Sequence, residues 1–227
     1  DRSVSRGLGD VYKRQVLGMW LDWQAQGTVV DSNVFYRNTR DVMTEVTHGP
    51  ITFMNNVFAS EFSFDDYAQG AAFVNNLFAG RIRHTAVLDR STPYHFPHVT
   101  DVAGEAFVYG GDDRYVNNLF LAVDDSAKPL CTADAAGAAG MAEAGTAFFD
   151  GYPRSLEEYE QLIEEAGLGD EELYRSVKQP VLLASNAYVS GAKAASGEAE
   201  AVVSGDGSSL ASVSYTHLRA HETLSDL

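Results

Sequence analysis

Short apolar runs recur along the chain, and each begins after an asparagine. The runs are SNVFY (32–36), MNNVF (54–58), VNNLF (74–78), VNNLF (116–120) and a weaker SNAYV (185–189). Their asparagines are Asn33, Asn56, Asn76, Asn118 and Asn186, with successive spacings of 23, 20, 42 and 68 residues. Apolar runs this short, recurring about every twenty residues, predict a solenoid of parallel β-strands.

In such a solenoid each turn of chain stacks on the next at about 4.8 Å, the usual distance between strands. The aliphatic residues and phenylalanines would form apolar columns inside, and the asparagines an amide ladder at a tight corner. A leucine-rich repeat also contains asparagine, but it needs several spaced leucines per unit. We therefore expect an all-β fold, a right-handed parallel β-helix.

A different periodicity interrupts the repeat at 152–177. Ser155 and Glu158 match a capping box, which marks the start of a helix. The apolar residues of the expected helical face are Leu156, Tyr159, Leu162 and Ile163. Gly167 is a suitable stop. We expect a short helical insertion outside the solenoid.

The two ends of the chain do not fit the repeat. Residues 1–15 and 212–227 resemble translated sequencing adapters of the kind found in metagenome assemblies, so they are excluded from fold reasoning. Residues 16–211 are then expected to be a partial β-helix domain that starts and stops within a longer protein.

Two carboxylates occupy the same place in consecutive repeats. Asp22 lies eleven residues before Asn33, and Glu45 lies eleven residues before Asn56. Equal offsets stack in a solenoid, so the α-carbons of the two acids should lie about 5 Å apart. Retaining glycosidases hold their two carboxyl groups ~5–5.5 Å apart, and inverting ones ~6.5–9.5 Å. The alternative is that both acids are solvated on the outer surface.

The neighbours of this pair suit a sugar-binding cleft, which combines an aromatic platform with fixed polar groups. Trp23, Gln24 and His48 lie in the same strip, together with Trp20 and Gln26.

Two further segments, TPYHFPH (92–98) and GGDDR (110–114), are expected to line the cleft. Their candidate side chains for substrate binding are His95, His98, Asp113 and Arg114. The alternatives are packed histidines at the first segment and a local ion pair between Asp113 and Arg114 at the second.

No metal site and no cofactor are expected. The spacing of His48, His95 and His98 matches no zinc signature. Asp65 and Asp66 leave calcium as a lesser alternative, because Asp65 lies eleven residues before Asn76.

Composition narrows the class of partner. The formal charge of −16 and the pI near 4.6 argue against nucleic acid and anionic membranes, which attract basic surfaces. One cysteine, Cys131, allows no internal disulfide. No apolar run approaches the ~18–20 residues that span a bilayer, and no signal peptide is visible. We expect a cytoplasmic protein that acts on a neutral ligand.

Several of these segments together resemble the β-xylosidases of glycoside hydrolase family 120. They are WLDWQAQGT (20–28), TEVTHGP (44–50), NNVF (55–58), TPYHFPH (92–98) and GGDDRYVNNLF (110–120). The resemblance covers about residues 16–121. It implies a parallel β-helix with a flanking β-sandwich, a retaining mechanism and xylo-oligosaccharide substrates. It also implies that Asp22 is the nucleophile and Glu45 the general acid/base.

The resemblance further implies that residues from earlier turns of the solenoid and from the flanking domain take part. We therefore expect the fragment alone to be inactive or poorly soluble, and we leave open a homo-oligomer in the intact protein. Two other classes stay open: a polysaccharide lyase or pectinase-like enzyme, and a non-catalytic carbohydrate-binding solenoid. The first favours acidic sugars and basic or calcium subsites, which the acidic composition argues against.

Overall fold

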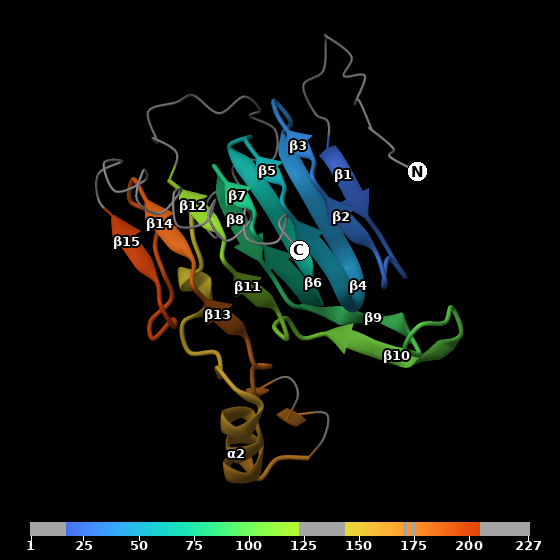
Figure 1. Ribbon diagram of the computed structural model, residues 1–227. Coiled ribbons are helices and arrows are strands. Elements are labelled where there is room, and N and C mark those ends of the chain that lie inside the picture. The colour runs from blue at the N-terminus through green and yellow to red at the C-terminus, as the bar shows by residue number, and fades with distance from the viewer. Residues whose placement is uncertain (1–16, 123–143, 170–171, 174–175, 205–227) are drawn as a thin grey trace, which may run out of the picture.

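The computed structural model describes residues 17–122, 144–169, 172–173 and 176–204. The two adapter-like ends and Cys131 lie outside these ranges. The described chain is mostly β-structure (Figure 1). Its elements are β1 (Leu17–Leu21), β2 (Val29–Asp31), β3 (Val34–Phe35), β4 (Arg40–Met54), β5 (Val57–Phe58), β6 (Phe62–Val74), β7 (Leu77–Phe78), β8 (Arg81–His84), β9 (Val87–His95), β10 (Val102–Val108), β11 (Arg114–Val116), β12 (Leu119–Leu121), the 3₁₀ helix η1 (Ala147–Phe149), α2 (Leu156–Ala166), β13 (Leu182–Ala184), β14 (Ala187–Val189) and β15 (Val202–Ser204).

Parallel pairing joins most strands into two sheets. The seven-stranded sheet has the order β1-β4-β6-β11-β13, with β2 also paired to β4 and β8 to β6. The six-stranded sheet has the order β15-β14-β12-β7-β5-β3. Strands that follow one another in these orders come from successive repeats and stack side by side (Figure 1). This arrangement is consistent with a parallel β-helix, and we call each successive turn of chain a rung.

The asparagines form the predicted ladder. In each step the Nδ2 group donates to the Oδ1 of the next asparagine. The steps are Asn33 to Asn56 at 3.2 Å, and Asn56 to Asn76, Asn76 to Asn118 and Asn118 to Asn186 at 3.0 Å each. The residue before each asparagine has a positive φ, a backbone region that Asn and Ser at a corner adopt more readily than β-branched residues. The repeated motif therefore encodes one left-handed corner per rung.

Aromatic rings stack in register beneath this ladder. One column runs through Phe35, Phe58, Phe78, Phe120 and Tyr188, with ring centroids 4.9–5.3 Å apart. A second column joins Phe53, Phe73 and Tyr115 at 5.1 and 4.3 Å. All of these rings are buried, so the predicted apolar columns are confirmed for the phenylalanines. The aliphatic residue before each Phe does not face the interior as expected, because Val34 is 73% exposed and Val57, Leu77 and Leu119 are only partly buried.

The long strands β4 and β6 pair irregularly in their middle, where β4 carries extra residues. Their register shifts between Glu45 and Thr47, and again between His48 and Ile51. Consequently Asp65 pairs with Met43, and Tyr67 occupies the position beside Glu45. The offset counted from Asn76 therefore misplaced Asp65 by two residues.

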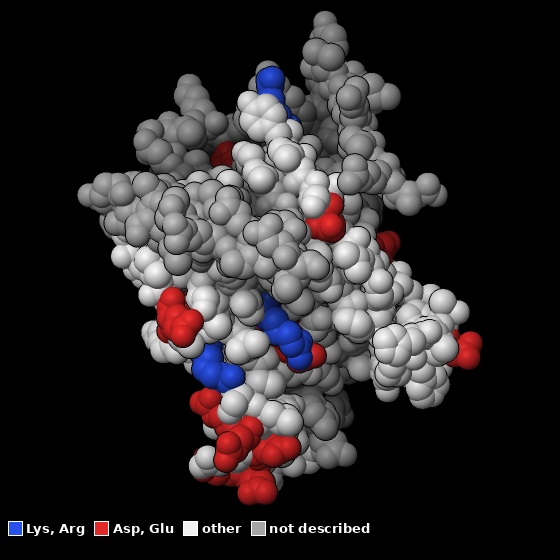
Figure 2. Space-filling view, viewed as in Figure 1, with Lys and Arg blue, Asp and Glu red and all other residues white. Residues whose placement is uncertain are grey.

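The insertion contains the expected helix. Ser155 caps α2 by accepting a hydrogen bond from the Glu158 backbone N–H at 3.1 Å, and Gly167 closes it with φ 59°. The helix projects away from the sheets (Figure 1) and buries none of its residues. Acidic side chains gather over it (Figure 2). Among the described residues no helix has the length and apolar character needed to cross a membrane.

Candidate active site

The register between β1 and β4 brings Asp22 and Glu45 to neighbouring positions. Leu21 pairs with Thr44, and Asp22 and Glu45 are the next residue on each chain. The predicted stacking with a 23-residue offset is therefore confirmed for the strand that leads to Asp22. Neighbouring strands lie ~4.8 Å apart, so the two backbones approach closely at this point.

Alternation along β4 divides its side chains between two faces. Val42 and Thr44 are buried inside, whereas Met43 and Glu45 are partly exposed. Trp20, which pairs with Met43, is 54% exposed. Glu45 thus points to the outer surface, where a ligand can reach it, and the aromatic Trp20 lies on the same face of the sheet.

A groove with a volume of about 660 Å³ opens over this face. Its floor is formed by Met43, Glu45 and Tyr67, and its wall by residues 86–90, which lead into and begin the β9–β10 hairpin. Burial, reinforced by the charge of Asp65, raises the pKa of the Tyr67 hydroxyl, so this group stays a neutral hydrogen-bonding partner at ordinary pH.

Arg90 holds the carboxylate of Glu45. Its Nη2 donates to Glu45 Oε1 at 3.0 Å, and both side chains remain partly exposed. Sequence reasoning missed Arg90 and Tyr67. The correct register would have indicated Tyr67, but no local pattern links Arg90 to an acid 45 residues earlier.

The turn that begins at Asp22 is stiffened by its own hydrogen bonds. Asp22 Oδ1 accepts from the Trp23 backbone N–H at 2.8 Å, and the Ala25 N–H donates to the Asp22 carbonyl at 3.1 Å. Trp23 and Gln24 follow with exposed side chains, and Gln24 has a φ of 60°. Both predicted sugar-contacting residues are therefore accessible beside Asp22.

Gln26 ties this turn to the hairpin. Its side-chain oxygen accepts from the His95 backbone N–H at 2.8 Å, and its Nε2 donates to the His95 carbonyl at 3.3 Å. His95 therefore lies next to the turn, held through its backbone, while His98 lies exposed near the hairpin tip with φ 63°. Of the two predicted histidines, the structure brings His95 to the Asp22 turn.

His48 is a packed histidine. It is 7% exposed, one ring nitrogen lies 3.2 Å from the Thr92 carbonyl, and the other lies 3.1 Å from Gln69 Nε2. Its ring also meets Tyr94 edge-on at 5.7 Å. Both nitrogens are engaged by the protein, so the expectation that His48 grips a sugar is corrected: it anchors the hairpin.

The expectations for the GGDDR segment are also corrected. Asp113 has no exposed surface and faces the interior, where a sugar on the outer face cannot reach it. Arg114 pairs with Asp112 at 3.0 Å, not with Asp113. The side chain of Arg114 is half exposed. Its strand position is in register with Ala72 and Thr52, beyond the register shifts of β4, so it lies away from Glu45.

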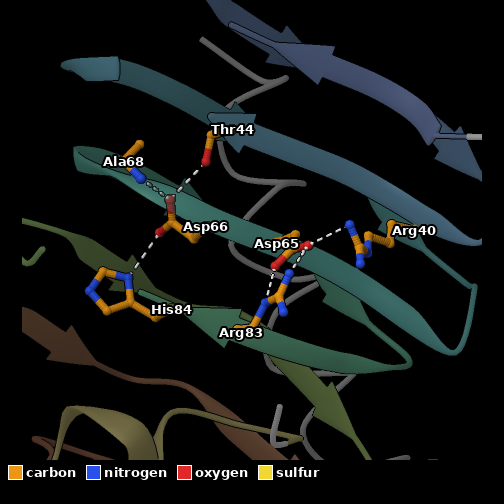
Figure 3. A network of polar contacts seen from close by, with 7 residues as sticks. All are labelled: Arg40, Thr44, Asp65, Asp66, Ala68, Arg83 and His84. Carbon is orange, nitrogen blue, oxygen red and sulfur yellow. Dashed lines mark hydrogen bonds and ion pairs between the residues drawn. The ribbon is translucent and has the colours of Figure 1, made fainter. Parts of the chain in front are cut away.

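An ion-pair network borders the groove residues (Figure 3). Asp65 accepts from Arg83 through both carboxylate oxygens and lies 3.0 Å from Arg40. The Arg83 guanidinium also lies 5.0 Å from the centre of the Tyr67 ring. The arginines take up both oxygens of Asp65, which removes the lesser calcium alternative at Asp65. Asp22, Glu45 and the groove-lining Asp89 remain at least partly exposed.

Among known proteins, a solved structure resembles this chain. No family model matches the chain, and no curated protein matches it. A solved structure, XylC in complex with xylose, resembles it with a TM-score of 0.73 and 41% sequence identity. The match covers 85% of this chain and 28% of XylC, so the chain corresponds to about a quarter of that protein.

Proposed function

We propose that this chain carries the two catalytic acids of a retaining glycoside hydrolase that releases xylose from xylo-oligosaccharides. The observation that supports the proposal is the register of β1 on β4, which continues to Asp22 next to Glu45, together with the open groove that Glu45 lines. The 41% identity to XylC, a protein solved with xylose, supports the sugar. A right-handed β-helix of glycoside hydrolase family 120 is the proposed fold and family.

The proposed reaction proceeds in two displacements. In the first, Glu45 donates a proton to the glycosidic oxygen while an oxygen of Asp22 attacks the anomeric carbon. The glycosidic bond breaks, the shortened sugar leaves as an alcohol, and the xylosyl group stays bonded to Asp22. In the second, Glu45 takes a proton from water, whose oxygen attacks the anomeric carbon and frees Asp22. Two inversions return the original β configuration.

The surroundings of the two acids support roles for three neighbouring side chains. The strand spacing of ~4.8 Å is close to the ~5–5.5 Å carboxyl separation of retaining enzymes. Trp23 and Gln24 are proposed sugar contacts because they are exposed beside Asp22. Arg90 is a proposed positioning residue, since its contact with Glu45 Oε1 leaves Oε2 available for proton transfer.

The test uses a chimera in which residues 17–204 of this chain replace the matching segment of XylC. XylC supplies the remainder of the chimera, because the match covers 28% of its length. We expect the chimera to release xylose from xylobiose with retention of configuration, followed by NMR. Asp22→Asn and Glu45→Gln should each lower kcat at least a thousandfold, because each removes a group that reacts in both displacements. Asp112→Asn removes an exposed acid that does not line the groove and should leave kcat unchanged.

A mechanism-based 2-fluoroxyloside adds a direct readout. It should label a peptide that contains Asp22, because the fluorine slows the second displacement and traps the glycosyl-enzyme. Activity that survives Asp22→Asn would overturn the proposal. Xylobiose binding without turnover, unaffected by either acid substitution, would instead favour the carbohydrate-binding solenoid.

A further inference from the structure

Beneath the outer groove, the interior of the solenoid holds a second group of acids. Asp66 of β6, His84 of β8 and Asp113, which directly precedes β11, face inward from neighbouring strands. Asp66 and Asp113 have no exposed surface, and the His84 side chain is 3% exposed. Figure 3 shows the side chains of Asp66 and His84 pointing toward each other from the neighbouring strands β6 and β8. Glu45 lies on the opposite side of the same sheet, so this group is separate from the proposed catalytic acids.

The three side chains aim one atom each at a common point. The Nδ1 atom of His84 lies 3.2 Å from Asp66 Oδ2 and 3.8 Å from Asp113 Oδ2. These three atoms all lie within 4.8 Å of one another. The remaining oxygens are already used. Asp66 Oδ1 accepts from the Thr44 hydroxyl at 2.8 Å and the Ala68 N–H at 3.1 Å, and Asp113 Oδ1 accepts from the Ala71 N–H at 2.9 Å.

The inner ends of this group lack protein partners. Asp113 Oδ2, His84 Nε2 and the hydroxyl of Tyr115 are buried without a hydrogen bond among the described residues. Buried polar atoms are nearly always satisfied, so several at one place call for a bound species. Asp113 Oδ2 in particular has no hydrogen-bond partner, although it lies 3.8 Å from His84 Nδ1.

The two buried carboxyl groups also favour a positively charged ligand. Burial, with the neighbouring Asp66 carboxylate adding to it, raises the pKa of Asp113 well above its usual range. Burial, with the same two acids adding to it, raises the pKa of Tyr152 to about 12. Two carboxylates in an apolar interior are costly unless a cation or a proton compensates them.

We propose that Asp66, His84 and Asp113 bind one divalent transition-metal ion, best fitted by Zn²⁺, inside the solenoid. Zinc bonds to nitrogen and carboxylate oxygen of ~2.0–2.2 Å at tetrahedral angles place neighbouring donors ~3.4 Å apart. The observed 3.2 and 3.8 Å separations bracket that distance. The Tyr115 hydroxyl or a water would complete the coordination.

The donor set selects the class of metal. An imidazole nitrogen suits zinc and its neighbours in the transition series, whereas calcium and magnesium prefer six or more oxygen ligands. Aromatic side chains close the site on one side, since the His84 ring stacks on Phe148 and packs at an angle against Phe149 and Tyr152. A closed site of this kind is structural, and the ion would join β6, β8 and the start of β11.

The experiment measures metal content and stability on this chain, purified with a solubility tag and stripped with EDTA. Calorimetric titration with zinc sulfate should give about one site per chain, and mass spectrometry of the metal should confirm it. Zinc should raise the melting temperature. Cobalt in place of zinc should give the visible absorption of a four-coordinate site, which a protein that holds only a proton between its acids cannot show.

Matched variants locate the ion. Asp113→Asn and His84→Gln should weaken zinc binding at least a hundredfold. Asp112→Asn, the exposed neighbour, and the double variant His95→Ala with His98→Ala should retain it. Should Asp113→Asn fail to fold, His84→Gln and the cobalt spectrum still decide. A wild-type chain without stoichiometric zinc, or a His84→Gln variant that binds it as tightly, would overturn the proposal. Neither result bears on Asp22 or Glu45, because no step of this test measures hydrolysis.

Discussion

The guanidinium of Arg90 lies 3.0 Å from Glu45 Oε1, although 45 residues separate them in the chain. The contact joins the hairpin to the outer face of β4 at the groove. Both side chains are partly exposed, 44% for Arg90 and 27% for Glu45. An ion pair that solvent reaches this well contributes at most about 1 kcal/mol to stability, so its main effect is on the orientation of Glu45.

The first prediction concerns this orientation. In the XylC chimera, Arg90→Ala should lower kcat/KM about tenfold, equivalent to ~1.4 kcal/mol, while the melting temperature stays within one or two degrees. Arg90→Lys should restore part of the loss, because it keeps one charged donor. Arg114→Ala removes a similarly exposed arginine bound to Asp112 and is the control. Equal losses in Arg90→Ala and Arg114→Ala would show that the Glu45 contact is unimportant.

A second prediction concerns the ladder. Asn76→Ala should lower the free energy of unfolding by about 3 kcal/mol or more, measured by urea denaturation. The Asn76 side chain accepts from the Asn56 N–H and donates to Asn118 and to the Phe53 carbonyl. Each buried group left without a partner costs about 1–3 kcal/mol.

The control for the ladder is Asn55→Gly. Asn55 is exposed and has a φ of 56°, which glycine adopts readily. This variant should cost less than about 1 kcal/mol. If the two variants were equally destabilised, the effect would come from the corner backbone and not from the amide ladder.

The rungs were predictable because each repeat encodes its own stacking. The Asn motif fixes one corner per rung, the Phe that follows it adds one ring to the interior column, and identical spacing then sets the register of Asp22 on Glu45. The offset failed at Asp65 because the extra residues of β4 lie between the acid and the asparagine. Counting residues between motifs does not show at which point of a rung an extra residue is inserted.

The interior acids were missed for a different reason. Strand alternation gave a signal, since Asp113 stands two residues before the buried Tyr115 and so shares its face. The GGDDR segment was interpreted as a cleft-lining loop, which placed Asp113 on the substrate side and not in the interior. His48 was misjudged because it follows a bulge, where alternation no longer tells inside from outside. The link from Arg90 to Glu45 depends on how the hairpin folds back and has no local signature.

A third prediction tests the aromatic column. Phe78→Ala should cost about 3–5 kcal/mol in unfolding free energy, because the ring is fully buried and stacks on Phe58 at 4.9 Å and on Phe120 at 5.0 Å. Phe35→Ala should cost less, since that ring is 8% exposed and has a described stacking partner on one side, at 5.3 Å. Tyr36→Ala, at a side chain 67% exposed, should change stability by no more than about 0.5 kcal/mol. If Phe35→Ala cost as much unfolding free energy as Phe78→Ala, the number of stacked neighbours would not determine what a ring contributes.

The last prediction concerns pH. Burial lowers the pKa of His48 below its usual value of ~6.5. Above pH ~6.5 neither the folded nor the unfolded state binds this proton, so the contribution of neutral His48 is complete. As the pH falls through ~6.5 the unfolded state takes up the proton first, and stability decreases until the pH reaches the lower folded pKa.

His48→Gln removes this linkage, so its unfolding free energy should fall less between pH 7.5 and 5 than that of the wild type. His98→Gln, at an exposed histidine, should keep the wild-type slope. Parallel pH dependences for wild type and His48→Gln would mean that His48 titrates alike in the folded and unfolded chain, and that its contacts with Thr92 and Gln69 compensate for its burial.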